Sequence, residues 1–247
     1  TAYEIYQCDW SSDVCSSDLK DSYGSLNDDY FFRQGTYSHD FTAKSDITLI
    51  VFDGVNINAD HVAKKQHGYR NWIRRKTGKE VNLIIVKDGE RPDTRYTANY
   101  QGLYGICDSV DELGIFLSSI IKKHAPYSKI IETGDCGGII PAALTTKDLN
   151  PHSMIFTTPY LTIIGSENDF TVDDRSVWIA KENSSWVFDN CIENKHRFDI
   201  VPALIDYLNC SHSQLYMHWN KFVYGSDRWF LDRGLQLSLD YPNCNVV

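Results

Sequence analysis

A cysteine flanked by glycines carries the clearest chemistry in this sequence. It lies at the centre of Gly134-Asp135-Cys136-Gly137-Gly138, after an apolar β-like run and before a segment rich in small residues. A turn from strand to helix can hold a nucleophile clear of a sheet, and glycines two residues to either side tolerate the crowding. A thiol at a helix N-terminus also has a lowered pKa, which increases its reactivity. We therefore predict that Cys136 is a nucleophile; the alternative is a small buried core residue, a common place for free cysteine.

The same five residues resemble the nucleophile elbow of the α/β-hydrolase fold, in particular that of dienelactone-hydrolase-like members, which carry Cys in a G-x-C-x-G-G setting. The resemblance covers roughly residues 45–247 as an order of elements rather than as identity. It implies that Cys136 attacks an acyl carbonyl. The oxyanion would accept hydrogen bonds from Gly137 N–H and from Gly54 or Val55, which follow an earlier strand. Asp53 stands where the family often has His, and its carboxylate would oppose an oxyanion unless it turned away.

The resemblance also implies an acid and a histidine after later strands. Asp227 is the preferred acid, because it follows Cys136 by 91 positions and lies after a predicted strand. Asp169 competes, but 33 positions leave little chain for the intervening elements. The family histidine follows the last strand, where this sequence stops, so we expect the catalytic base to be missing. His196 or His218 is the alternative base, although His218 falls inside a predicted strand and is more often a packed residue there.

Apolar runs and amphipathic segments alternate along the chain. The predicted strands are residues 46–55, 80–90, 128–134, 152–163, 213–222 and 243–247, after an edge hairpin within 20–46. The predicted helices are 64–79, 108–126, 139–149, 196–209 and 227–241, with an irregular stretch at 165–195. Alternation of this kind favours parallel pairing, and the polar loops then gather at the carboxyl edge, where open α/β sheets bind ligands. We predict a three-layer α/β/α fold with a mostly parallel sheet, α/β-hydrolase-like and truncated at both ends.

The first nineteen residues, TAYEIYQCDWSSDVCSSDL, resemble the translation of a short-read sequencing adaptor and are excluded from the fold. Residues 20–247 are then predicted to form a single domain, with 165–195 as an insertion. Five cysteines remain, without metal-ligand spacing, and we expect mostly reduced thiols and a cytoplasmic setting. The net charge of −9 argues against nucleic acid as a partner, and no apolar window is long enough to span a membrane. No metal or cofactor is expected.

Two functions follow from these residues. The first is an esterase, acyl hydrolase or acyltransferase that works through an acyl-cysteine. Its substrate would be a small-molecule or glycan-linked acyl compound, for which aromatic residues in the predicted loops are suited: Tyr96, Tyr100, Tyr104, Tyr160, Trp178 and Trp186. The second is a non-catalytic α/β-hydrolase-fold module for binding or assembly, favoured by Cys in place of Ser, by Asp53 and by the missing histidine. The sequence leaves the oligomeric state open.

Overall fold

The described elements are built around one eight-stranded sheet. The computed structural model describes residues 29–33, 37–53, 61–87, 102–103, 106–157, 200–218 and 226–247. Its strands are β1 (Tyr30–Arg33), β2 (Tyr37–Asp40), β3 (Ile47–Asp53), β4 (Asn82–Lys87), β5 (Lys129–Asp135), β6 (Ser153–Thr157), β7 (Leu215–His218) and β8 (Cys244–Val246). Their order in the sheet is β1-β2-β4-β3-β5-β6-β7-β8. The hairpin β1–β2 is antiparallel and pairs with β4, whereas the six strands from β4 to β8 across the sheet run parallel.

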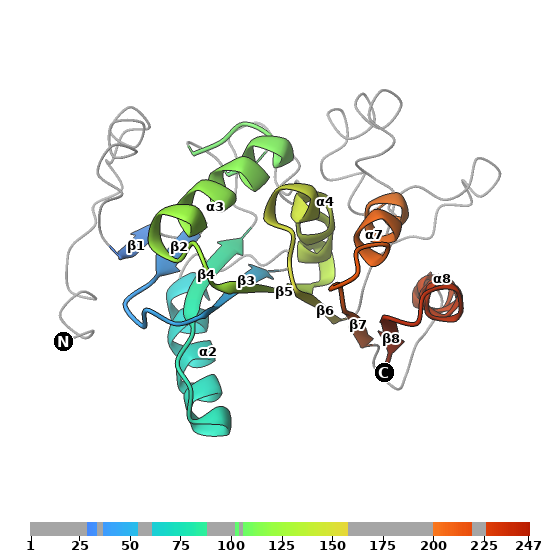
Figure 1. Ribbon diagram of the computed structural model, residues 1–247, viewed down its shortest axis with the longest axis horizontal. Helices are drawn as coiled ribbons and strands as arrows, with labels where there is room; N and C mark the ends of the chain where they lie inside the picture. Colours follow the sequence, from blue (N-terminus) through green and yellow to red (C-terminus); the bar gives the residue numbers. More distant parts are fainter. Residues whose placement is uncertain are drawn as a thin grey trace.

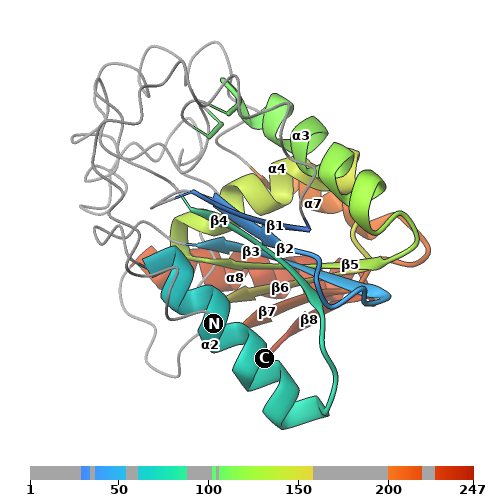
Figure 2. The same ribbon diagram turned by 90° about the vertical axis from the view of Figure 1, so that its left-hand side faces the viewer.

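Helices cover the sheet on both sides, which gives the predicted three layers. They are α2 (His61–Thr77), α3 (Val110–His124), α4 (Ile139–Leu149), α7 (Val201–Leu208) and α8 (Ser226–Asp240). Figure 1 shows α3, α4 and α7 on one side and α2 on the other, and Figure 2 shows the same arrangement from the side of the hairpin. The parallel strands are joined through helices, as the alternation of elements predicted. No helix in the described part of the chain has both the length and the apolar character needed to cross a membrane.

Burial explains why these segments form these elements. The larger apolar cluster lies between the sheet and helices α3, α4, α7 and α8, and a smaller one lies between the sheet and α2. The helix predicted at 108–126 is confirmed as α3, and six apolar residues at i, i+3, i+4 spacing are buried in it: Val110, Leu113, Phe116, Leu117, Ile120 and Ile121. Ser109 caps this helix by accepting a hydrogen bond from Glu112 N–H at 3.1 Å.

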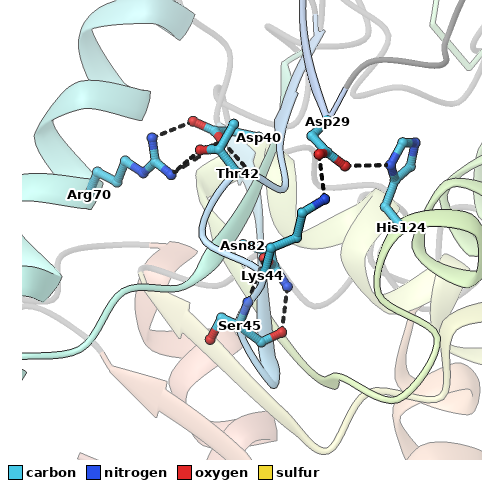
Figure 3. Close-up of polar contacts among 8 residues, drawn as sticks. All are labelled: Asp29, Asp40, Thr42, Lys44, Ser45, Arg70, Asn82 and His124. Carbon is cyan, nitrogen blue, oxygen red and sulfur yellow. Dashed lines mark hydrogen bonds and ion pairs between the residues drawn. The ribbon is translucent and has the colours of Figure 1, made fainter.

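Polar contacts attach the hairpin to its neighbours (Figure 3). Arg70 of α2 reaches the buried Asp40 of β2, with Nη1 2.6 Å from Oδ2 and Nη2 3.2 Å from Oδ1. On the other side of the hairpin, Asp29 is paired with Lys44 and lies 3.2 Å from Nδ1 of His124 on α3. Hydrogen bonds from Lys44, and next from His124, lower the pKa of Asp29. The hairpin is therefore tied to both helical layers.

The predicted elements are confirmed, and several of the predicted ranges extend beyond the described residues. The helix predicted at 139–149 matches α4 at both ends, whereas the strand predicted at 152–163 is described only over Ser153–Thr157. The strand predicted at 213–222 is described over Leu215–His218. The adaptor-like residues 1–19 and the predicted insertion 165–195 lie outside the described residues.

Candidate active site at the carboxyl edge

The turn that carries Cys136 joins a central strand to a buried helix. Strand β5 ends at Asp135, a single 3-10 turn covers Cys136–Gly138, and α4 begins at Ile139. This is the predicted strand-turn-helix, and it places Cys136 at the N-terminal end of α4, where the helix dipole favours a thiolate. The structure describes the backbone of Cys136 but not its side chain.

Both outer glycines of the turn are crowded, as the sequence predicted. A Cβ on Gly134 would stand 2.9 Å from the Cα of Ile139. A Cβ on Gly138 would stand 2.2 Å from the carbonyl oxygen of Phe52 and 2.8 Å from that of Asp53. Real Cβ contacts are not this short, so only glycine fits at either position without a backbone shift. The turn is thus packed directly against the end of β3, the strand that precedes the predicted oxyanion loop.

The carboxyl ends of five neighbouring strands carry a row of polar side chains, which we call the carboxyl-edge row: Lys87, Asp53, Asp135, Thr157 and His218. Lys87 pairs in register with Asp53, and Thr157 pairs with both Asp135 and His218. Phe52 pairs with Gly134, so the next residues, Asp53 and Asp135, also lie side by side. Because side chains alternate between the faces of a strand, all five project to the same face of the sheet. That face is the one covered by α2, where Val51, Leu83, Ile85 and Tyr69 cluster.

Contacts within the row link it to the turn and to α2. The Thr157 hydroxyl donates to Asp135 Oδ1 at 3.0 Å and lies 3.4 Å from the Gly134 carbonyl oxygen. Burial raises the pKa of Tyr69 on α2, and the negative charges of Asp53 and Asp135 raise it further. The Tyr69 hydroxyl therefore lies within electrostatic reach of both carboxylates. Asp135 directly precedes Cys136 in the sequence. Thr157 on β6 and His218 on β7 continue the row from Asp135 across the sheet.

The sequence left open whether the Asp53 carboxylate turns away from the turn that carries Cys136. Its neighbour Phe52 belongs to the cluster beneath α4, and Val51 belongs to the cluster beneath α2. Alternation therefore turns Asp53 toward α2, where it is buried and raises the pKa of Tyr69. The carboxylate therefore projects from the face of the sheet opposite α4.

A second buried carboxyl lies deeper in β5. Glu132 is fully buried on the α4 side of the sheet, in register with Ile50 and Met154, and neither of its oxygens has a hydrogen-bond partner among the described residues. Burial raises its pKa well above the ordinary value. The pKa of Tyr207 on α7 is raised by burial and, less strongly, by the Glu132 carboxyl. Glu132 is therefore a neutral acid in an apolar layer, two residues before the turn begins.

The remaining predicted site residues are only partly placed. Gly137 is buried in the 3-10 turn. Asp227 lies in the first turn of α8, after β7 as predicted, and its side chain lies outside the described residues. Gly54, Val55, Asp169 and His196 also lie outside them. Whether these residues act in catalysis stays a prediction.

Sequence reasoning missed most of the row. Lys87 and Thr157 fell inside predicted strands, and His218 was interpreted as a packed or sheet-facing strand residue. The structure places His218 at the end of β7, on the face of the sheet that α2 covers, where it is exposed at the carboxyl edge. These residues share one sequence feature that could have predicted the row: each is a polar residue at the point where an apolar run ends.

The thiols differ in accessibility. Cys107 and Cys244 are buried, Cys210 is exposed, and none of the three forms a disulfide. Burial raises the pKa of Cys244 to about 11. The prediction of reduced thiols is confirmed for these three residues, and Cys210 offers an accessible thiol far from the turn in the sequence.

The order of the parallel strands, the helices on both faces and the glycine-bounded turn after the central strand define the fold. The chain has an α/β-hydrolase-like fold. No known family profile matches the sequence. The α-(1,3)-fucosyltransferase fut-6 of Caenorhabditis elegans is 39% identical over 49 residues, which make up 19% of this chain and 12% of the fucosyltransferase. A match over 49 residues is too short to assign this chain to a protein family.

Solved structures give similar overall arrangements at low identity. A candidate esterase of Staphylococcus aureus is 12% identical with a TM-score of 0.47, covering 90% of this chain and 75% of that one. MPT51 (FbpC1) of Mycobacterium tuberculosis is 11% identical with a TM-score of 0.44, covering 80% and 77%. The Glycosylation Associate Protein (Gap123) complex of Streptococcus agalactiae is 14% identical with a TM-score of 0.46, and the match covers 85% of this chain but 39% of that one. Because these TM-scores are below 0.5, the fold assignment depends on the sheet order and the turn described above.

Proposed function

We propose that this protein is an acyl hydrolase or acyltransferase that acts on an ester, thioester or amide through an acyl-cysteine at Cys136. The observation that carries the proposal is the turn itself: a cysteine backbone between β5 and α4, with Gly138 packed against the end of β3. A tight turn of this kind can present a side chain and the N–H groups beside it, and a structural cysteine needs neither.

The proposed mechanism gives each of the predicted site residues one role. The N-terminus of α4 stabilises the Cys136 thiolate, which attacks the acyl carbonyl. The tetrahedral oxyanion accepts hydrogen bonds from Gly137 N–H and from Gly54 or Val55 N–H after β3. Collapse expels the leaving group and leaves a thioester on Cys136, which water or a second acceptor then cleaves. Asp227 would orient the base of this second step.

The proposal also covers the domain organisation, the substrate class and the cellular setting. We assign residues 20–247 to one α/β-hydrolase-like domain, because the strands from β1 to β8 belong to a single sheet. A glycan-linked or aromatic acyl substrate and a cytoplasmic setting are part of the proposal. The aromatic residues that suggested such a substrate lie outside the described residues.

A second candidate function is a binding or assembly module with the same fold. It is favoured by the carboxylate of Asp135, the residue directly before Cys136, because a negative charge beside the turn opposes both a thiolate and an oxyanion. On this alternative the turn would be inherited with the fold, and Cys136 would have ordinary thiol reactivity.

One experiment separates the two candidates. The full chain is incubated with 4-nitrophenyl acetate, quenched in acid and mapped by peptide mass spectrometry. An acyl hydrolase carries the acetyl group on Cys136 well above the exposed Cys210, and Cys136→Ala loses nitrophenol release while Cys210→Ala retains it. Equal labelling of Cys136 and Cys210, with hydrolysis unchanged in Cys136→Ala, would establish the binding module instead.

A further inference from the structure

Basic side chains gather at the amino edge of the sheet, the edge opposite the turn that carries Cys136. Helices that join parallel strands run back along them, so α2 and α3 both end at this edge, beside the loop after β2, on the right-hand side of Figure 2. We call residues 41–47, 72–82 and 122–129 the basic edge. These residues include two acidic side chains and eight lysines and arginines, all eight of them exposed: Lys44, Arg74, Arg75, Lys76, Lys79, Lys122, Lys123 and Lys129.

The charge of the basic edge is opposite in sign to that of the chain as a whole, which is −9. Its two acidic residues are Asp46 and Glu80, and Glu80 lies 3.8 Å from Arg74. A third carboxylate, Asp29, lies outside the three segments and is paired with Lys44. The eight cations outnumber these carboxylates, so the edge is positive. A positive surface on an acidic protein attracts an anionic partner and also orients the protein toward it.

Two aromatic side chains project from the basic edge, on opposite sides of the sheet. Trp72 on α2 is 58% exposed, and Tyr127, in the loop after α3, is 96% exposed. Trp72 shares one face of α2 with Arg75 and Lys76, which follow it by three and four residues. Trp and Tyr have an apolar ring and a polar tip, and they are the side chains that anchor proteins in the headgroup layer of a membrane.

Hydrogen bonds hold the three segments of the basic edge together. Ser45 N–H donates to Asn82 Oδ1 at 3.1 Å, and Asn82 Nδ2 donates to the Ser45 carbonyl oxygen at 2.8 Å. Lys129 N–H donates to the Asp46 carbonyl oxygen at 2.7 Å. The first pair joins the loop after β2 to the start of β4, and the second joins the same loop to the start of β5. The backbone of the edge is therefore formed before any partner binds, which lowers the entropic cost of binding.

We propose that the basic edge docks the protein on an anionic phospholipid membrane. A membrane surface is a plane of negative charge, so it contacts the cations of all three segments at once. It also takes up Trp72 and Tyr127 from both sides of the sheet. A nucleic acid strand fits this arrangement less well, because strand binding stacks successive bases on aromatic residues along one groove. Docking in this orientation turns the carboxyl edge and the turn after β5 away from the lipid, and it does not depend on the chemistry of Cys136.

Vesicle flotation tests the proposal. The full chain is mixed with vesicles of phosphatidylcholine alone, or with vesicles that contain about a quarter of phosphatidylglycerol. The partition coefficient should be about tenfold or more higher on the anionic vesicles. It should fall as the salt concentration rises from about 0.05 to 0.5 M, because the Debye length shortens. Hydrogen exchange should slow within residues 41–47, 72–82 and 122–129 when anionic vesicles are added.

Lys76→Gln and Lys147→Gln form a matched pair of variants. Both residues are exposed lysines, but Lys147 lies on α4 outside the basic edge, 2.6 Å from Asp111. Lys76→Gln should lower the partition coefficient by about fivefold, and Trp72→Ala should also lower it, whereas Lys147→Gln leaves it unchanged. Urea unfolding verifies that each variant is folded. Equal losses in the two lysine variants, or equal partition onto the two kinds of vesicle, would overturn the proposal. Binding of a single-stranded DNA oligonucleotide without binding of the anionic vesicles would overturn it in favour of a nucleic acid partner.

Discussion

Gly138 lies so close to Phe52 that a Cβ on the glycine would stand 2.2 Å from the Phe52 carbonyl oxygen. This approach joins the N-terminus of α4 to the end of β3, two elements whose residues are more than eighty positions apart in the sequence. It fixes the position of Cys136 relative to the chain that leaves β3, which is where the second oxyanion donor is predicted. The turn therefore joins β5 to α4 and also packs the N-terminus of α4 against the end of β3.

Gly138→Ala is expected to destabilise the protein by about 1–3 kcal/mol, because the added methyl group has to displace backbone rather than a side chain. Acylation of Cys136 should fall more than stability alone accounts for, since the oxyanion donors move apart. Urea unfolding and the 4-nitrophenyl acetate burst measure the two effects.

Gly68→Ala is the matched control. Gly68 lies in α2, and a Cβ there would have nothing within 4 Å, so alanine should raise the free energy of unfolding by up to about 1 kcal/mol. Equal behaviour of the two variants would contradict the close approach of Gly138 to β3.

Much of the fold was predictable from sequence because its signals are local. The six apolar residues of α3 repeat at helical spacing and are all buried, and the segment 139–149 has Pro141 in its first turn, where a missing N–H is harmless. Each of these features depends on residues within one element.

The parts that escaped prediction depend on register between elements. Asp53, Asp135, Thr157 and His218 come from four strands, and only the pairing of those strands aligns them. The attachment of α2 was hidden in a similar way. Arg70 on this helix is bound to a carboxylate that is buried in β2, and only the packing of α2 on the sheet brings the two residues together.

Arg70→Met is expected to lower the free energy of unfolding by about 2–3 kcal/mol. The Asp40 side chain is 4% exposed and, among the described residues, would keep only Thr42, which donates from N–H at 3.0 Å and from its hydroxyl at 2.6 Å. Removing one partner of a buried ion pair leaves an uncompensated charge; the loss stays below that of a fully buried pair because Arg70 is 29% exposed. Urea unfolding measures the loss, and hydrogen exchange should show faster opening of α2.

Arg74→Met provides the comparison on the same helix. Arg74 is 70% exposed and its guanidinium lies 3.8 Å from Glu80, so its removal should change stability by no more than about 0.5 kcal/mol. If Arg70→Met and Arg74→Met cost the same, the Asp40 contact would not be what holds α2 against β2.

Glu132 gives the protein a stability that falls as pH rises. Its pKa in the folded chain is raised well above the ordinary 4.5 by burial, so the folded chain binds a proton that the unfolded chain has already lost. Relative to Glu132→Gln, the wild type is therefore most stable below pH 4.5. It loses about 1.4 kcal/mol per pH unit above that, until the folded pKa is passed.

Glu132→Leu extends the same prediction. Leucine removes two oxygens that have no partner among the described residues and packs among Ile50, Met154 and Leu215, so we expect the free energy of unfolding at pH 7 to rise by about 1–3 kcal/mol. Glu132→Gln keeps the shape but cannot ionise, and it separates the proton linkage from the packing gain. Urea unfolding at several values between pH 4 and 8 measures all three proteins. Parallel pH profiles for wild type and Glu132→Gln would show that Glu132 is already ionised in the folded chain, and that some group outside the described residues compensates its charge.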